Sequence, residues 1–230
     1  MRARVPSFSA HRHYARSMRF NELRVENFRA IANIEISDLR DLVVIAGPNG
    51  CGKSTVFDAM RLLKSAYGGY QFNEWMQWFG EFQIAPNDPA TFGALFRDRT
   101  RALSISANIQ LAPGEIAYLQ ANAESVLEPL IWAEITGQPA ENFGYSGFAF
   151  AGQFPHLAES AASLTASRAN ELRSELSATS HSLHLTIPPS GSLATTPSAV
   201  ARAVFQTYNP SSIGILDFHG ASRTYQAHPD

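Results

Sequence analysis

The sequence predicts an α/β fold with a mixed β-sheet, and three observations support this. Residues 42–46 form a continuous apolar run with β-branched residues at its centre, which is typical of a strand buried on both faces of a parallel core. A glycine-rich turn and a helix with regular apolar spacing follow that run directly. Upstream, residues 19–28 and 33–39 alternate apolar and polar side chains, which indicates two half-buried antiparallel strands.

Size and composition limit the classes of protein to consider. The chain has 230 residues, 45% of them hydrophobic, and a formal net charge of −2, so it resembles a globular domain without an overall positive field for nucleic acid. Contact with DNA would require a local basic patch or a partner. The single cysteine, Cys51, excludes an intramolecular disulfide and fits a reducing compartment, so we expect a cytoplasmic location. No apolar run approaches the roughly 20 residues that a membrane helix needs, so we expect no membrane contact.

Residues 1–17 differ from the rest of the chain. They contain four arginines, two histidines and no acidic residue, and they show no hydrophobic periodicity. We predict a disordered basic extension or an upstream start codon here. An organelle presequence and an arm that contacts nucleic acid are the alternatives. Met18 then opens the patterned region, so residues 18–230 are predicted to form the folded part.

The region after the glycine-rich turn is predicted from its spacing. Apolar residues recur at helical intervals over residues 53–67, and a glycine pair follows as a C-cap. Residues 70–101 are rich in aromatic side chains and are interpreted as a packed, partly helical excursion, with an aromatic surface for bases or a partner as the alternative. Further strands are predicted at 102–111, 130–136, 182–188 and 212–218, further helices at 113–128, 156–179 and 198–208, a loop or irregular hairpin at 138–156, and a linker at 188–197.

The glycine-rich turn carries the chemistry. Its residues, GPNGCGKS, fit the pattern G-x-x-x-x-G-K-[ST], with a predicted strand before them and a helix after them. Successive amides and the helix N-terminus would together bind an anion. Lys53 would reach the β- and γ-phosphates of a nucleotide, the Ser54 hydroxyl would bind Mg²⁺, and Thr55 would contribute to the α-phosphate. The candidate nucleotide-binding residues of this loop are Gly47, Pro48, Asn49, Gly50, Cys51, Gly52, Lys53, Ser54 and Thr55.

Cys51 occupies a position that the pattern leaves free. We interpret it as a tolerated small residue. The alternative is a redox-sensitive thiol made more acidic by the positive field of the loop. The seven histidines do not cluster with acids at the spacing of metal ligands, and His181 and His184 are predicted to lie on opposite faces of a strand.

Residues 18–67 resemble the N-terminal lobe of ABC-type ATPases of the RecF, SMC and SbcC-like group, with the overcoming-lysogenization-defect nucleases as relatives. The match includes a strand, the turn "NFR", two further strands and "GPNGCGKST". The resemblance implies a P-loop NTPase with an ABC-ATPase-like N-terminal lobe, a mixed sheet, an antiparallel segment before the loop, and a helical insertion around residues 113–180. It also implies that Arg29, of the "NFR" turn, lies near the phosphates or base. The alternative is an exposed arginine at a strand end.

The resemblance also shows departures from the group. Its glutamine loop has four candidates here, Gln71, Gln77, Gln83 and Gln110, and spacing does not choose among them. Its signature segment and its Asp-Glu strand are poorly matched by residues 190–192 and by Asp217, because Phe218 stands at the position of the catalytic glutamate. We therefore expect Asp217 to be structural and the hydrolytic residues to lie outside this chain. Arg223 is interpreted as a solvated loop residue, with a phosphate or an acidic partner as the alternative.

Together these features predict an ATP- and Mg²⁺-binding lobe, incomplete by itself, of an ATPase in DNA repair, chromosome maintenance or anti-phage defence. We expect hydrolysis to need a second subunit or a C-terminal lobe, an ATP-dependent dimer in the full-length protein, and very slow turnover by this chain alone. The alternative is a non-hydrolysing, ATP-gated scaffold that regulates a partner nuclease. A nucleoside or small-molecule kinase is disfavoured by the antiparallel strands before the loop and by the lack of a recognisable lid.

Overall fold

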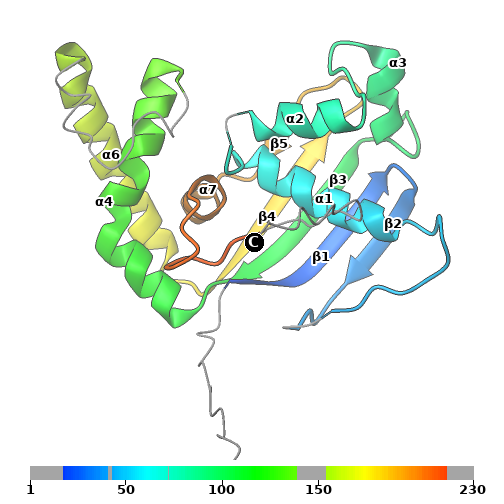
Figure 1. Cartoon of the computed structure of the whole chain (residues 1–230), viewed down its shortest axis with the longest axis horizontal. Coiled ribbons are helices and arrows are strands. Elements are labelled where there is room, and N and C mark those ends of the chain that lie inside the picture. The colour runs from blue at the N-terminus through cyan, green and yellow to red at the C-terminus, as the bar shows by residue number, and fades with distance from the viewer. Residues whose placement is uncertain (1–17, 41–42, 72, 139–153, 217–230) are drawn as a thin grey trace, which may run out of the picture.

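A computed structural model describes residues 18–40, 43–71, 73–138 and 154–216 of the chain. One β-sheet and several helices make up this part (Figure 1). The strands are β1 (Arg19–Phe28), β2 (Ile31–Ile36), β3 (Leu103–Gln110), β4 (Ser180–Ile187) and β5 (Ala194–Thr195). The helices are α1 (Lys53–Ala66), α2 (Glu74–Glu81), α3 (Pro89–Phe92), a 3-10 turn (Gly93–Leu95), α4 (Pro113–Thr136), α6 (Pro155–Glu175) and α7 (Ala199–Gln206).

The sheet has the strand order β2-β1-β3-β4-β5, and each of these pairings is antiparallel. In one cross-strand row, Val25 lies opposite Ile34 on one side and Ile105 on the other, and Ile105 lies opposite Leu185. Val25, Ile105 and Leu185 are fully buried. Because side chains alternate between the faces of a strand, this register gives one apolar face and one polar face.

The apolar face is the one that the helices cover. Helices α1, α2 and α7 lie against one side of the sheet in Figure 1, and α4 and α6 form an antiparallel pair beside it. Leu62 and Leu63 of α1 and Phe205 of α7 are among the fully buried side chains. The opposite face carries Ser, Asn, His and Thr side chains, for which water is a sufficient partner.

The segment before the phosphate loop contradicts the prediction of a parallel core strand. Residues 43–47 form no strand, and Val43 and Val44 are 44% and 79% exposed. The interior strands β1, β3 and β4 have neighbours on both sides, and the edge strands β2 and β5 pair, among the described strands, with β1 and β4 alone. Residues 43–47 thus pair with none of the described strands. The sheet of the described residues is entirely antiparallel, and the predicted mixed sheet is wrong for this part of the chain.

Other predicted elements have mixed outcomes. The strands predicted at 19–28, 102–111 and 182–188 and the helix that begins at Lys53 are confirmed. The strand predicted at 130–136 is wrong, because these residues are the last two turns of α4. The strand predicted at 212–218 is absent over residues 212–216, and its last two residues lie outside the described ranges.

Pro129 lies inside α4 without ending it. The helix is instead distorted at Asn122, whose φ of −114° is not helical. Beyond the proline, Ile131 and Trp132 are buried in a small cluster with Ala161 of α6. This packing against a second helix outweighs the loss of one backbone hydrogen bond at the proline.

The aromatic segment after α1 packs into the core, as the interpretation of residues 70–101 expected. Trp78 and Phe79 of α2 are almost fully buried, and the Trp78 ring lies 6.1 Å from that of Phe28 in β1. Phe92 and Phe96 continue the same core. Within the described ranges, no helix combines the length and the apolar composition that crossing a membrane requires.

Candidate phosphate-binding loop

The loop before α1 leaves the N-terminus of that helix open to a ligand. Gly52 is the N-cap, with φ of 91°, and no side chain caps the helix. No acidic residue occupies the first turn. The first amide groups of a helix have no partner within it, so those of α1 and its positive dipole end remain available to an anion. Gly50, with φ of 82°, also has the left-handed conformation that glycine adopts at little cost.

Lys53 is held over this loop by the backbone. Its Nζ donates hydrogen bonds to the carbonyl oxygens of Gly47, at 2.8 Å, and Pro48, at 2.7 Å. An ammonium group has three donors, so one N–H is left beyond these two carbonyls. The Cys51 thiol lies 3.8 Å from Nζ, a distance that makes it a weak competitor for that donor. The lysine is thus oriented before any phosphate arrives, and a phosphate oxygen can take the third N–H.

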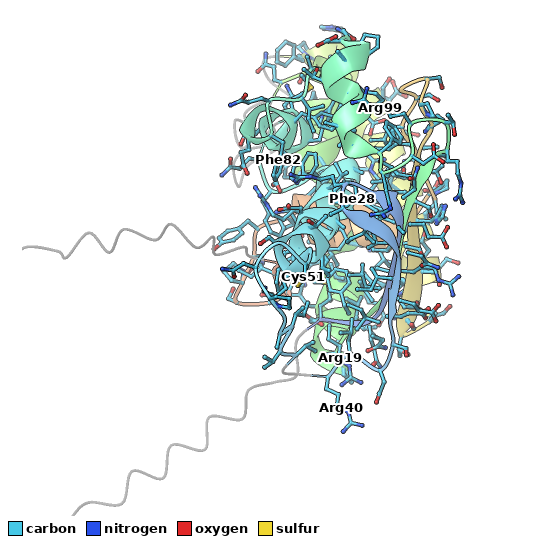
Figure 2. The ribbon with its side chains drawn as sticks, turned by 90° about the vertical axis from the view of Figure 1, so that its right-hand side faces the viewer. Arg19, Phe28, Arg40, Cys51, Phe82 and Arg99 are labelled. Atoms are coloured by element: carbon cyan, nitrogen blue, oxygen red, sulfur yellow. The ribbon has the colours of Figure 1, made fainter. Side chains whose placement is uncertain are left out.

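Close packing inside the loop explains one of its glycines. A Cβ atom on Gly47 would lie 2.8 Å from Cys51 Sγ, which is closer than such atoms approach in proteins. Cys51 itself is exposed, on the side of the sheet that the helices cover (Figure 2). The short side chain at position 51 therefore fits beside Gly47 without closing the loop.

The hydroxyl residues follow at the start of α1. Ser54 is exposed and Thr55 is half-buried. No group of three or more His, Cys, Asp or Glu side chains that could hold a metal occurs in the described part of the chain. A single serine hydroxyl beside a phosphate site nevertheless fits Mg²⁺, because this ion keeps several waters and takes substrate phosphates as ligands. Ser54 would hold the ion, and the ion would neutralise charge on the phosphates when bound.

Arg29 lies at the β1–β2 turn, with φ of 50° and its amide donating to the Leu95 carbonyl. Its guanidinium donates to Asp58 Oδ2 of α1 at 3.0 Å and stacks 4.2 Å from the centre of the Phe82 ring. Burial raises the pKa of Asp58, and the charge of Arg29 opposes that effect. The sequence analysis did not link Arg29 to Asp58 or to Phe82. The helical spacing of Asp58 after the loop was the available signal for the first.

The glutamine candidates take different places. Gln71 lies at the C-terminal end of α1, opposite the phosphate loop, and Gln77 lies on α2. Gln83 follows α2 with φ of 54°. Gln110 Oε1 accepts hydrogen bonds from the Arg19 guanidinium at 2.7 Å and 3.1 Å, and from the Asn21 amide at 3.2 Å. These hydrogen bonds hold the Gln110 side chain at the end of the sheet.

The remaining sequence candidates lie away from the loop or outside the described residues. Residues 190–192 belong to the turn between β4 and β5, where the Gly191 amide donates to the Pro188 carbonyl at 2.9 Å. His181 is buried and His184 is exposed, which confirms that they lie on opposite faces of β4. Asp217, Phe218 and Arg223, like residues 1–17, fall outside the described ranges.

Comparison with known proteins identifies the family of the chain. The family model of an AAA ATPase domain matches residues 18–132, which is half of the chain and includes the whole phosphate loop. The chain belongs to the AAA ATPase domain family. The family model matches this AAA ATPase domain from the start of β1 into α4, and the match therefore covers β1, β2, β3 and α1. This establishes an α/β chain of the P-loop NTPase class whose described sheet is antiparallel.

One curated relative is an uncharacterized protein of Methanocaldococcus jannaschii, 30% identical over 70 residues. That alignment covers 27% of the present chain and 32% of the relative. The chain therefore spans about a third of the length of the protein that it matches. No solved structure matches the chain.

Proposed function

We propose that this AAA ATPase domain binds ATP with Mg²⁺ at the loop of residues 47–55, in the manner of the RecF, SMC and SbcC-like ATPases. The orientation of Lys53 by the Gly47 and Pro48 carbonyls carries this proposal. It is supported by the uncapped N-terminus of α1 and by the left-handed glycines at positions 50 and 52. Lys53 would contact the β- and γ-phosphates, Ser54 would hold Mg²⁺, and Thr55 would contact the α-phosphate.

We further propose that the site is completed by a second subunit or a C-terminal lobe. The support is the segment before the loop, where the consecutive residues Val43 and Val44 are 44% and 79% exposed. Adjacent exposed apolar side chains at a nucleotide site favour burial by another polypeptide, because leaving them in water costs free energy. ATP would be enclosed by this contact, which gives an ATP-dependent dimer, and hydrolysis would release it. A role on DNA in repair, chromosome maintenance or anti-phage defence follows only from the family resemblance.

Titration calorimetry with ATP and Mg²⁺ tests the nucleotide site. Lys53→Ala should weaken binding by at least about 100-fold, because it removes a charge-assisted contact worth about 3 kcal/mol or more. Arg40→Ala is the matched control, since it removes one exposed positive charge just before the loop without touching the phosphate site. Equal affinities of the wild type and Lys53→Ala would overturn the proposal. An unchanged unfolding midpoint of Lys53→Ala would show that the loss is local.

Turnover distinguishes the ATPase from the ATP-gated scaffold that regulates a partner nuclease. We expect this chain to release phosphate very slowly, and to do so faster only when the lobe with an Asp-Glu strand is supplied. Phosphate release that remains at the level of the isolated chain, with that lobe and with DNA present, would support the scaffold instead. Steady-state phosphate release at saturating ATP measures the difference.

A further inference from the structure

A cleft in the described part of the chain lies at the other end of the phosphate-loop helix. It has a volume of about 1090 Å³ and is bounded by the C-terminal end of α1, the turn into α2, the middle of α4 and the segment around α7. Its walls carry several aromatic side chains, Tyr67, Tyr70, Trp75, Tyr118, Trp132 and Tyr208. The fourteen residues of α1 separate it from the phosphate loop. The cleft is therefore a separate site.

One lining residue of this cleft, Tyr70, already contacts a cation with its ring. The Lys64 ammonium lies 4.1 Å from the centre of the Tyr70 ring and 2.6 Å from a carboxylate oxygen of Glu74. Aromatic faces attract cations through the negative potential of the ring, and a carboxylate adds a full charge. Lys64 is 8% exposed, so this combination holds an ammonium group out of water.

The lining of the cleft also contains a further aromatic ring, that of Tyr208, and a further carboxylate, that of Glu128. Tyr208 is 62% exposed, although its ring also meets the edge of Tyr70 at 5.5 Å. Glu128 of α4 is half-buried in the wall and forms no ion pair or hydrogen bond with any residue in the described ranges. The other charges in the wall are Glu134 and Arg202, which pair with each other at 3.0 Å. The lining therefore carries one net negative charge beside exposed aromatic surface.

We propose that this cleft binds a small organic cation with a single ammonium group and an apolar body. Glu128 would neutralise the positive charge, and Tyr208 would stack against the alkyl groups around the nitrogen. Ligand clefts combine apolar and aromatic surface with polar groups that orient the ligand, and the lining of this cleft contains both kinds of group. A polyamine with several charges fits less well, because Glu128 is the one unpaired carboxylate that lines this cleft in the described part of the chain.

Choline and its neutral isostere 3,3-dimethylbutan-1-ol test the proposal, because they share a shape and differ in charge. Calorimetry and tryptophan fluorescence should show that the full chain binds choline with an affinity at least about tenfold higher than its affinity for the alcohol. Glu128→Gln and Tyr208→Leu should each reduce choline affinity by about tenfold and leave the unfolding midpoint unchanged. Glu159→Gln is the control, since it removes an exposed charge of α6 outside the cleft.

Equal affinity for choline and the alcohol, or undiminished choline binding by Glu128→Gln, would overturn the proposal. Lys53→Ala separates this site from the nucleotide site, because it should weaken ATP binding by at least about 100-fold and leave choline binding intact. Loss of choline binding in Lys53→Ala would also contradict a separate site. A lysine-containing peptide that binds while choline does not would assign the cleft to a polypeptide and exclude the small cation.

Discussion

Arg29 Nη1 lies 3.0 Å from Asp58 Oδ2, and this ion pair joins the β1–β2 turn to the helix that carries the phosphate loop. The Arg29 and Asp58 side chains are 31% and 11% exposed, so water screens the pair only in part. The Phe82 ring covers the same guanidinium and connects it to the end of α2. The pair therefore fixes α1 against two other elements close to the proposed nucleotide site.

Replacing Arg29 by methionine should lower the free energy of unfolding by about 2 kcal/mol at pH 7, because it leaves a mostly buried carboxylate without its charged donor. The arginine lowers the pKa of Asp58, which burial raises, so its removal should raise that pKa further. As the pH falls through the raised folded-state pKa, Asp58 becomes protonated in either protein, so the loss should be smaller at pH 4 than at pH 7. Urea unfolding at both pH values measures this.

The control for this prediction is Arg40→Met. Arg40 pairs with Asp38 at 3.0 Å, but both side chains are 80% exposed, so the loss should be below about 0.5 kcal/mol. A loss for Arg29→Met as small as the one for Arg40→Met would contradict the structural role of the Arg29–Asp58 pair.

His181 should make the fold sensitive to acid. Burial lowers the pKa of its imidazole, against the opposing effects of Glu175 and the Ala178 backbone, and its Nε2 has no hydrogen-bond partner among the residues that the structure describes. A lowered folded-state pKa means that the unfolded chain binds the proton first. The stability is therefore complete above about pH 6.5 and falls as the pH decreases below that value.

His181→Leu should flatten this dependence between pH 7 and pH 5, because no proton is then taken up on unfolding at position 181. His184→Leu is the matched control, since His184 is exposed on the same strand. Unfolding free energies of the three proteins across this range provide the measurement. An equally steep decline in His181→Leu would show that another group is responsible.

Glu115 should be required to hold both ends of the described chain on the domain. Its carboxylate accepts hydrogen bonds from the amides of Met18, at 2.9 Å, Ala112, at 2.7 Å, and Gly214, and the residue is 5% exposed. Glu115→Gln presents an NH₂ group to some of these donors, so we expect a loss of about 2 kcal/mol.

Hydrogen exchange should become faster at the Gly214 amide and its neighbours in Glu115→Gln. A general loss of stability would instead speed exchange throughout the domain. Glu124→Gln is the control on the same helix, because Glu124 is exposed and its contact with Arg173 is 3.3 Å long. Unchanged exchange at Gly214 would contradict the role of Glu115.

The strands with alternating burial could be predicted from the sequence because one face is buried and the other is not. In β3, for example, Leu103, Ile105, Ala107 and Ile109 are buried and the residues between them are not. The end of α4 could not be predicted in this way, because Leu130, Ile131 and Trp132 are consecutive and all buried. A short apolar run without periodicity fits a strand or a buried helix equally well.

The contacts within the loop of residues 47–55 are local. Lys53 meets the carbonyls of residues five and six positions before it, so the motif itself contains the geometry. Arg29 differs, because Asp58 and Phe82 are brought to it by the tertiary fold. The burial of residues 43–47 also depends on whether a strand is placed beside them, which the composition of the run does not reveal.

The attachment of α1 at its C-terminal end has a consequence for the order of folding. The Tyr67 hydroxyl donates to the Thr196 carbonyl beyond β5 at 2.9 Å, and the Gln206 side chain donates to the Tyr67 carbonyl at 2.7 Å. The phosphate-loop helix therefore lacks these supports until the ribosome has released residue 206, more than a hundred residues after the loop was made. Non-local pairing of this kind delays folding. A nascent chain should thus complete the support of this helix only after residue 206 has emerged from the ribosome.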